Sequence, residues 1–171
     1  MKVSQRYKIE SACSPDKLRL GGVLTRIALD CSTALPVLVA TDGHILAVVP
    51  AEACKEEAGF VTAESLKAAR KATPKKAETM ELLCNGSLAV PNGPSFPRPN
   101  DGLTFPRWQA VIPTEAPVLT VAFDVALLVR LAEAIGSDKV VLEISNPNHA
   151  IRVRPYMNDT EAYGVMMPLK H

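Results

Sequence analysis

The sequence contains the stretch VLVATDGHILAVV at residues 37–49. Two almost wholly apolar runs flank the pair Asp42-Gly43 in this stretch. An Asp-Gly pair between strand-like runs favours a tight hairpin, because the central turn residues must adopt positive φ. Apolar residues throughout both runs indicate that the two strands are substantially buried. Pro50 follows and ends the second run. The stretch therefore predicts a buried β-hairpin.

The rest of the first half predicts short strands and one helix. The helix is expected at 63–73, where the Thr62 side chain can cap the first turn and Pro74 ends it. Leu66 and Ala69 lie on its apolar face. Candidate strands lie at 7–12, at 18–30 with an interruption at Gly21-Gly22, and at 79–84 and 87–90 around the turn-forming pair Asn85-Gly86.

The second half repeats this plan. A strand at 118–123 leads into a helix that Asp124 caps and Gly136 ends. Helical spacing predicts a buried face made of Val125, Leu128, Leu131, Ala132 and Ile135. Further strands are expected at 139–145, 149–154 and 162–167, with Asn146-Pro147-Asn148 as a turn.

Each half therefore reads strand, helix, strand, strand. This order predicts an α+β protein with antiparallel sheets and few helices. The turn-rich residues 91–102 are the one boundary that composition suggests. We expect halves at 1–100 and 101–171 that together make one domain.

Composition places the chain among ordinary globular proteins. It has 171 residues, of which 47% are hydrophobic and 22% charged, and its formal net charge is +1. A disordered chain would have fewer apolar residues and a larger net charge. No apolar run reaches the roughly 18 residues of a membrane span, and the polar start leads into no signal core. We expect a cytoplasmic protein.

The sequence carries no recognisable catalytic or metal-binding signature. The cysteines Cys13, Cys31, Cys54 and Cys84 are too widely spaced for a zinc site or a redox pair. His44 has no nucleophile or acid nearby in the sequence to act with as a base. Asp42, Asp101 and Asp124 read as turn and cap residues. We therefore expect no enzyme activity, no cofactor and no metal.

Several segments together resemble the bacterial DNA polymerase III sliding clamp, the β subunit. The hairpin residues ATDGHILA, at 40–47, resemble the family's ATDGHRLA motif. The segment FPRWQAVIP, at 105–113, is similar to the FPxYxxV[IL]P that joins its middle and last domains. The end of the chain, from Tyr163 to Lys170, resembles its closing YxVMP motif. The match from Leu18 to Lys170 leaves no room for all the family's domains, so the chain looks like a condensed, single-domain clamp. The resemblance implies the DNA-clamp fold, with antiparallel sheets and the two helices in βαβββ-type repeats related by a pseudo-two-fold axis.

The resemblance implies a hydrophobic pocket in which replication proteins dock a short peptide. Carried over by motif, its residues are Thr41, Gly43, His44, Ile45 and Leu46 from the hairpin, Pro106 and Val111 from the linking segment, and Val165, Met167, Pro168 and Leu169 from the last strand. The family usually has Arg at the position of Ile45, and often at that of Ala110, so the rim here carries less charge. The alternative is that these residues simply pack as core.

The resemblance also implies helices that present basic residues to the backbone of duplex DNA without reading its sequence. The residues that match this role are Lys67, Arg70, Lys71, Lys75, Lys76 and, on the second helix, Arg130. The alternative is an ordinary solvated charged face.

The leading hypothesis is a processivity factor in DNA replication that tethers a polymerase to duplex DNA and forms a ring from several copies of the chain. The alternative is a monomeric adaptor or decoy that binds the same peptides without encircling DNA. Oligomeric state, together with retention on closed circular DNA, distinguishes the two.

Overall fold

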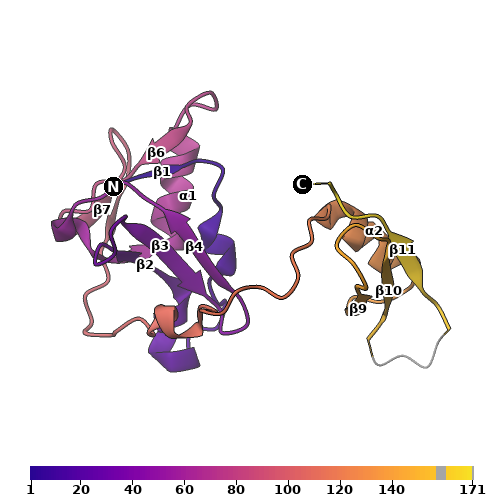
Figure 1. The fold of residues 1–171 in the computed structure, drawn as a ribbon. Coiled ribbons are helices and arrows are strands. Elements are labelled where there is room, and N and C mark those ends of the chain that lie inside the picture. Colours follow the sequence, from indigo (N-terminus) through magenta and orange to yellow (C-terminus); the bar gives the residue numbers. More distant parts are fainter. Residues whose placement is uncertain (157–160, 171) are drawn as a thin grey trace. The chain divides into compact units, whose positions relative to one another are not determined.

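The computed structural model describes residues 1–156 and 161–170. The chain divides into two compact units, Met1–Ile112 and Pro113–His171, each with its own core (Figure 1). The boundary between the units lies later than residue 100, where composition had placed it, because residues 103–112 pack against the first unit.

A four-stranded antiparallel sheet forms the centre of the first unit, and it contains the hairpin that the sequence predicts. Its strands are β2 (Arg26–Asp30), β3 (Val37–Thr41), β4 (Leu46–Pro50) and β5 (Gly59–Thr62), in the order β4-β3-β2-β5. Gly43 at the turn has a φ of 90°. Only β3 is buried as expected, because β4 lies at the edge of the sheet and is partly exposed.

The helix α1 (Ala63–Ala72) follows β5 and confirms the predicted helix. The Thr62 side chain caps it by accepting a hydrogen bond from the backbone N–H of Ser65 at 3.1 Å. Leu66 and Ala69 are fully buried in the core of the unit. The opposite face of α1 is therefore exposed to solvent.

Two small sheets complete the first unit. In one of them β1 (Lys2–Ser4) pairs with β6 (Thr79–Glu81), and in the other β7 (Ser87–Ala89) pairs with β8 (Ser95–Pro97). The hairpin expected around Asn85-Gly86 is therefore reduced to a bridge between Leu83 and Ala89. The segment 91–102, expected to be a loop, contains β8.

Of the predicted strands, the one at 7–12 is wrong and the one at 18–30 is confirmed only from Arg26, because 3₁₀ helices take the place of the rest. Residues 7–12 contain η1 (Ile9–Ala12), where Ile9 and Ala12 are buried three residues apart, as one turn of a 3₁₀ helix requires. Residues 18–25 contain η2 (Arg19–Thr25), and the strand begins only at Arg26. Positive φ at Leu20, Gly21 and Gly22 reverses the chain there and rules out an extended strand.

The described residues of the second unit form one α-helix and one antiparallel sheet. The helix α2 (Val125–Ala134) precedes β9 (Val140–Glu143), β10 (Ile151–Pro155) and β11 (Gly164–Met166), in the sheet order β11-β10-β9. Asp124 caps the helix, as predicted, by accepting a hydrogen bond from the Ala126 N–H at 2.8 Å.

Two expectations for the second unit need correction. Leu128, Leu131 and Ile135 pack against its core but are only partly buried, and Val125, in the first turn of α2, is 64% exposed. The strand expected at 118–123 is reduced to a bridge between Ala122 and Leu169, and Val118 is fully exposed. Among the described residues, no helix is long and apolar enough to cross a membrane.

Candidate peptide groove and basic surface

A groove of about 520 Å³ lies beside the tip of the β3–β4 hairpin. We call it the hairpin groove. It is lined by Leu20, Leu24, Thr41, Gly43, His44, Ile45, Leu46, Phe105, Pro106, Arg107, Trp108, Val111 and Ile112. All of these residues belong to the first unit.

Hydrogen bonds within the turn hold the hairpin side of this groove. The Asp42 carboxylate accepts the backbone N–H groups of His44 at 2.8 Å and Ile45 at 2.9 Å. These bonds, that from Ile45 first, lower the pKa of Asp42. Thr41 donates its hydroxyl to the Ile45 carbonyl at 2.5 Å and accepts the N–H of Gly43 at 3.0 Å. The turn is thus fixed while the Ile45 side chain stays 53% exposed.

A hydrogen bond connects the segment before β2 to this turn. Arg19 donates a hydrogen bond from Nη1 to the carbonyl oxygen of Asp42 at 2.8 Å. Gly43 permits this approach, since a Cβ at its position would lie 2.6 Å from Nη2 of Arg19. The contact places Leu20 in the wall of the groove.

Residues 103–112, which we call the strap, form the opposite wall. The rings of Phe105 and Phe60 lie 6.4 Å apart at 56°, a tilted aromatic contact. The strap ends in the 3₁₀ helix η4 (Trp108–Val111). Val111 is 69% exposed and Ile112 is 42% exposed, although both are apolar. They leave apolar surface open to the groove.

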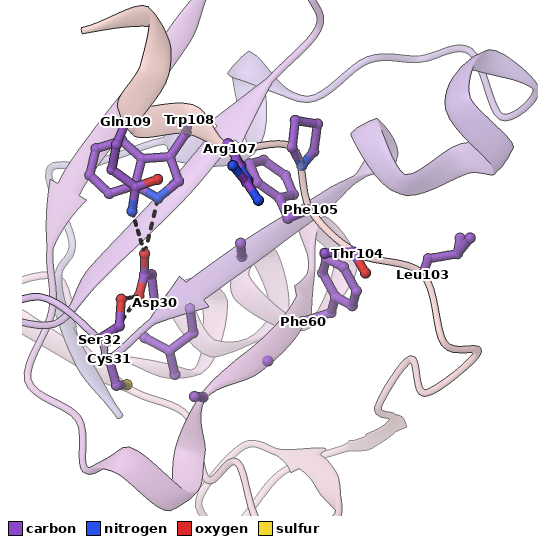
Figure 2. Close-up of a pocket in the computed structure, with 15 residues that line it drawn as sticks. Asp30, Cys31, Ser32, Phe60, Leu103, Thr104, Phe105, Arg107, Trp108 and Gln109 are labelled. Carbon is purple, nitrogen blue, oxygen red and sulfur yellow. Dashed lines mark hydrogen bonds between the residues drawn. The ribbon is translucent and has the colours of Figure 1, made fainter.

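Behind the strap lies a second groove of about 420 Å³, drawn in Figure 2. Asp30, at the end of β2, accepts hydrogen bonds from Nε1 of Trp108 at 3.0 Å and Nε2 of Gln109 at 3.2 Å. Hydrogen bonds from Ser32 come first among the causes that lower the pKa of Asp30, and Trp108 and Gln109 add to them. An ionised carboxylate therefore faces the strap.

The structure brings together part of the expected peptide pocket. The hairpin residues Thr41, Gly43, His44, Ile45 and Leu46 and the strap residues Pro106 and Val111 line the hairpin groove. The others, Val165, Met167, Pro168 and Leu169, belong to the second unit. There Val165 and Met167 line a separate groove of about 410 Å³ with Leu127, Leu131 and Arg130.

Sequence reasoning missed some lining residues of the hairpin groove. Phe105, Arg107, Trp108 and Ile112 lie inside the FPRWQAVIP segment, so that motif was a sufficient signal for them. Leu20 and Leu24 could not be found in this way. They reach the groove only because the chain turns at Gly21 and Gly22, where only an interruption within a strand was expected.

The expected basic residues differ in their surroundings. Lys67, Lys71, Lys75 and Lys76 are exposed, and we call them the basic surface. Arg70 instead forms an ion pair with Glu10 and donates from Nη2 to the Tyr7 carbonyl at 2.7 Å. Its charge is compensated inside the first unit. Within the described part of the chain, no ion pair involves the lysines of the basic surface.

Within the described residues, no group of three or more His, Cys, Asp or Glu side chains could hold a metal ion. Cys31 and Cys84 are buried, and desolvation raises the pKa of both thiols. Burial also raises the pKa of Cys13 to about 11. These thiols are therefore protonated near neutral pH, a state in which they are poor nucleophiles and poor metal ligands.

A comparison with protein-family models gives no match, and a comparison with curated proteins gives none. Solved structures do match. The β sliding clamp of C. crescentus, in a structure that contains bound PEG, superposes with a TM-score of 0.67 and 22% identity over 98% of this chain and 50% of that one. A DnaN sliding clamp from Bartonella birtlesii, bound to griselimycin, gives a TM-score of 0.48 and 17% identity over 100% of this chain and 66% of that one.

The match with the C. crescentus clamp confirms the fold that the three motifs predict. The chain spans about half the length of that structure. The protein thus has the α+β fold of the bacterial β sliding clamps, with antiparallel sheets and, in the part of the chain that the structure describes, two α-helices.

Proposed function

We propose that the protein is a non-catalytic clamp-like factor of DNA replication that acts in the cytoplasm and docks a short apolar peptide of a polymerase or another replication protein. The hairpin groove is the observation that carries this proposal. Its volume of about 520 Å³ falls within the range of small-ligand sites, roughly 300–1,000 Å³.

The lining of the groove suits an apolar peptide. Ile45, Val111 and Ile112 are exposed apolar side chains that a bound Leu or Phe would remove from water. The turn hydrogen bonds around Asp42 hold one wall before the peptide arrives, which lowers the ordering cost of binding.

Fluorescence anisotropy with a labelled peptide tests this proposal. The probe is a short fluorescein-labelled peptide whose only apolar residues are Leu and Phe, and the reference probe has Ser at both places. Ile45→Glu places a charge in the apolar groove, so we expect affinity for the Leu/Phe peptide to fall at least about ten-fold. Leu35→Glu is the matched control, because Leu35 is exposed but does not line the groove.

Unchanged affinity in Ile45→Glu would show that the peptide docks outside the hairpin groove. Equal binding of the two peptides by the native protein would show that it does not dock an apolar peptide specifically. Met167→Glu tests in the same assay whether one of the four expected pocket residues of the second unit takes part in binding. A loss with this variant would assign Met167 to the same binding site.

We further propose that the basic surface contacts the backbone of duplex DNA and so tethers the docked enzyme. Lys67 and Lys71 project from α1, and Lys75 and Lys76 follow its end. Arg130, exposed on α2, adds one charge in the second unit. Arg70 is not part of the proposed surface, because Glu10 already compensates its charge.

The salt dependence of binding to a random-sequence duplex tests this second proposal. Each lost phosphate contact lowers the slope of log K against log salt by about 1, so Lys67→Ala/Lys71→Ala should lower it by about 2. Lys17→Ala/Lys55→Ala removes the same charge from exposed lysines elsewhere and should leave the slope unchanged. Equal slopes for the two double variants would refute the assignment.

The monomeric adaptor remains the second candidate, and the state of Arg70 favours it. With Arg70 withdrawn and a formal net charge of only +1, the chain has little positive charge for holding DNA. Light scattering over a range of concentrations, with retention on closed circular against linear DNA, separates the candidates. A stable ring retained only on closed circles supports the processivity factor. A monomer that binds the peptide supports the adaptor.

A further inference from the structure

We propose that Asp30 is a positioning residue for the hairpin groove: its carboxylate holds the indole of Trp108 and so sets the strap wall against which the peptide docks. This inference rests on the proposed function, because it assumes that the groove binds a peptide. Asp30 itself does not line the hairpin groove, whereas Trp108 lines both that groove and the one behind the strap.

The two carboxylate oxygens of Asp30 accept hydrogen bonds from different segments (Figure 2). Oδ1 accepts the backbone N–H of Ser32 at 2.9 Å and its hydroxyl at 2.6 Å. Oδ2 accepts Nε1 of Trp108 at 3.0 Å and Nε2 of Gln109 at 3.2 Å. The turn after β2 thus orients the carboxylate, and the orientation directs its second oxygen at the strap.

The strap needs such an attachment, because the apolar side chains at its end are not buried in the core of the first unit. None of the residues of η4 is buried. Val111 and Ile112 stay exposed in the groove, so they give the segment little packing energy in the absence of a peptide. Bonds to an ionised carboxylate are about twice as strong as neutral ones, so Asp30 supplies a fixed point for η4.

A fixed wall lowers the cost of binding. If η4 moves freely, the peptide must order Trp108, Val111 and Ile112 as it docks, and that entropy cost weakens affinity. Loss of Asp30 would therefore act through the strap and not through a lost peptide contact. The effect should appear in peptide affinity and in the environment of Trp108 together.

Trp108 is the single tryptophan of the chain, so its fluorescence reports on the strap alone. We expect Asp30→Ala to increase acrylamide quenching of Trp108 and to weaken binding of the labelled Leu/Phe peptide about five-fold. Asp30→Asn keeps one acceptor oxygen and should restore part of both. Asp138→Ala, an exposed aspartate of the second unit, should change neither. Thermal unfolding confirms that each variant is folded.

A double-mutant cycle shows whether Asp30 acts through the strap. Trp108→Phe/Gln109→Ala removes both side-chain donors of the strap to Asp30. In that background we expect Asp30→Ala to change peptide affinity by less than about two-fold. An equal loss of affinity in both backgrounds would overturn the proposal, as would unchanged quenching or unchanged affinity in Asp30→Ala alone.

The outcomes separate this inference from the proposed function. If the native protein does not bind the Leu/Phe peptide, peptide docking fails, and with it the role of Asp30 in docking. Increased quenching in Asp30→Ala would then still show that Asp30 holds the strap. If the native protein binds and Asp30→Ala leaves affinity unchanged, only the positioning role is refuted.

Discussion

Several carboxylates in the first unit are held ionised by donors that the local chain places around them. Asp42 and Asp30 accept backbone N–H groups within two or three residues of themselves. Asp101 differs, because its partner Arg26 lies on β2, far away in the sequence. Local donors follow from turn chemistry, whereas the partner of Asp101 follows only from the fold.

The pH dependence of Asp101 is the prediction at this scale. Its ion pair with Arg26 lowers the pKa of Asp101 from 3.8 to about 2. Because the folded pKa is depressed, the pair contributes to stability above pH 3.8, and this contribution is lost as the pH falls towards 2. NMR titration of the Asp101 carboxyl carbon should show this low pKa, and Arg26→Gln should return it towards 3.8. An unchanged midpoint in Arg26→Gln would exclude the ion pair as the cause.

At the scale of elements, α1 is held by its cap, by its apolar face and by one ion pair. Thr62 supplies the cap, and Leu66 and Ala69 enter the core. On a third face, Arg70 reaches Glu10 of η1 and the carbonyl oxygen of Tyr7. The pair fixes the N-terminal segment against the helix, and it explains why one basic residue of α1 is withdrawn from the basic surface.

Breaking this pair from one side should cost more than removing both partners. The Glu10 side chain is only 7% exposed and that of Arg70 20%, so Arg70→Leu leaves a nearly buried, unpaired carboxylate. We expect Arg70→Leu to lower the free energy of unfolding by about 2 kcal/mol, below the range for fully buried pairs because Arg70 keeps some contact with water.

Glu10→Leu/Arg70→Leu should recover part of that loss. Urea denaturation of the native protein, of Arg70→Leu, of Glu10→Leu and of the double variant, followed by circular dichroism, measures the difference. Additive effects of the two single substitutions would show that the pair is not coupled. Lys71→Leu, next to Arg70 on α1 but exposed, is the control and should stay within about 0.5 kcal/mol of the native protein.

At the scale of the whole molecule, the described residues form two separate cores. One is formed only by residues of the first unit, around Ile27, Leu38 and Leu66. The other is formed only by residues of the second, around Ile151, Val153 and Met166. Separate cores indicate that each unit has the apolar contacts for its own fold.

A fragment of residues 1–112 should therefore keep the amide NMR spectrum that these residues have in the full chain. The comparison fragment, residues 1–100, ends where composition placed the boundary and lacks the strap. It should lose the native signals around Asp30 and the hairpin groove, because it lacks Trp108 and Gln109, which donate hydrogen bonds to Asp30. Collapse of the dispersed spectrum in the 1–112 fragment would show that the first unit depends on the second.

Much of the candidate site could be predicted from the sequence. Asp42-Gly43 between two apolar runs specified the hairpin, and the motif around it pointed to the residues of its tip. The Thr62 and Asp124 caps located the first residue of each helix, and Pro74 and Gly136 located the helix ends to within two residues. These features are local, since each depends on residues a few positions apart.

Tertiary structure alone decided the rest. Leu20 and Leu24 enter the groove through a reversal that the pattern of residues 18–30 did not reveal. Arg70 forms an ion pair with Glu10 and is mostly withdrawn from the solvent, and Asp30 meets Trp108 from a distant part of the chain. The sequence by itself determined the turns, caps and apolar faces, because their energies come from neighbouring residues. Which distant side chains meet depends on how the elements pack, and no local pattern encodes it.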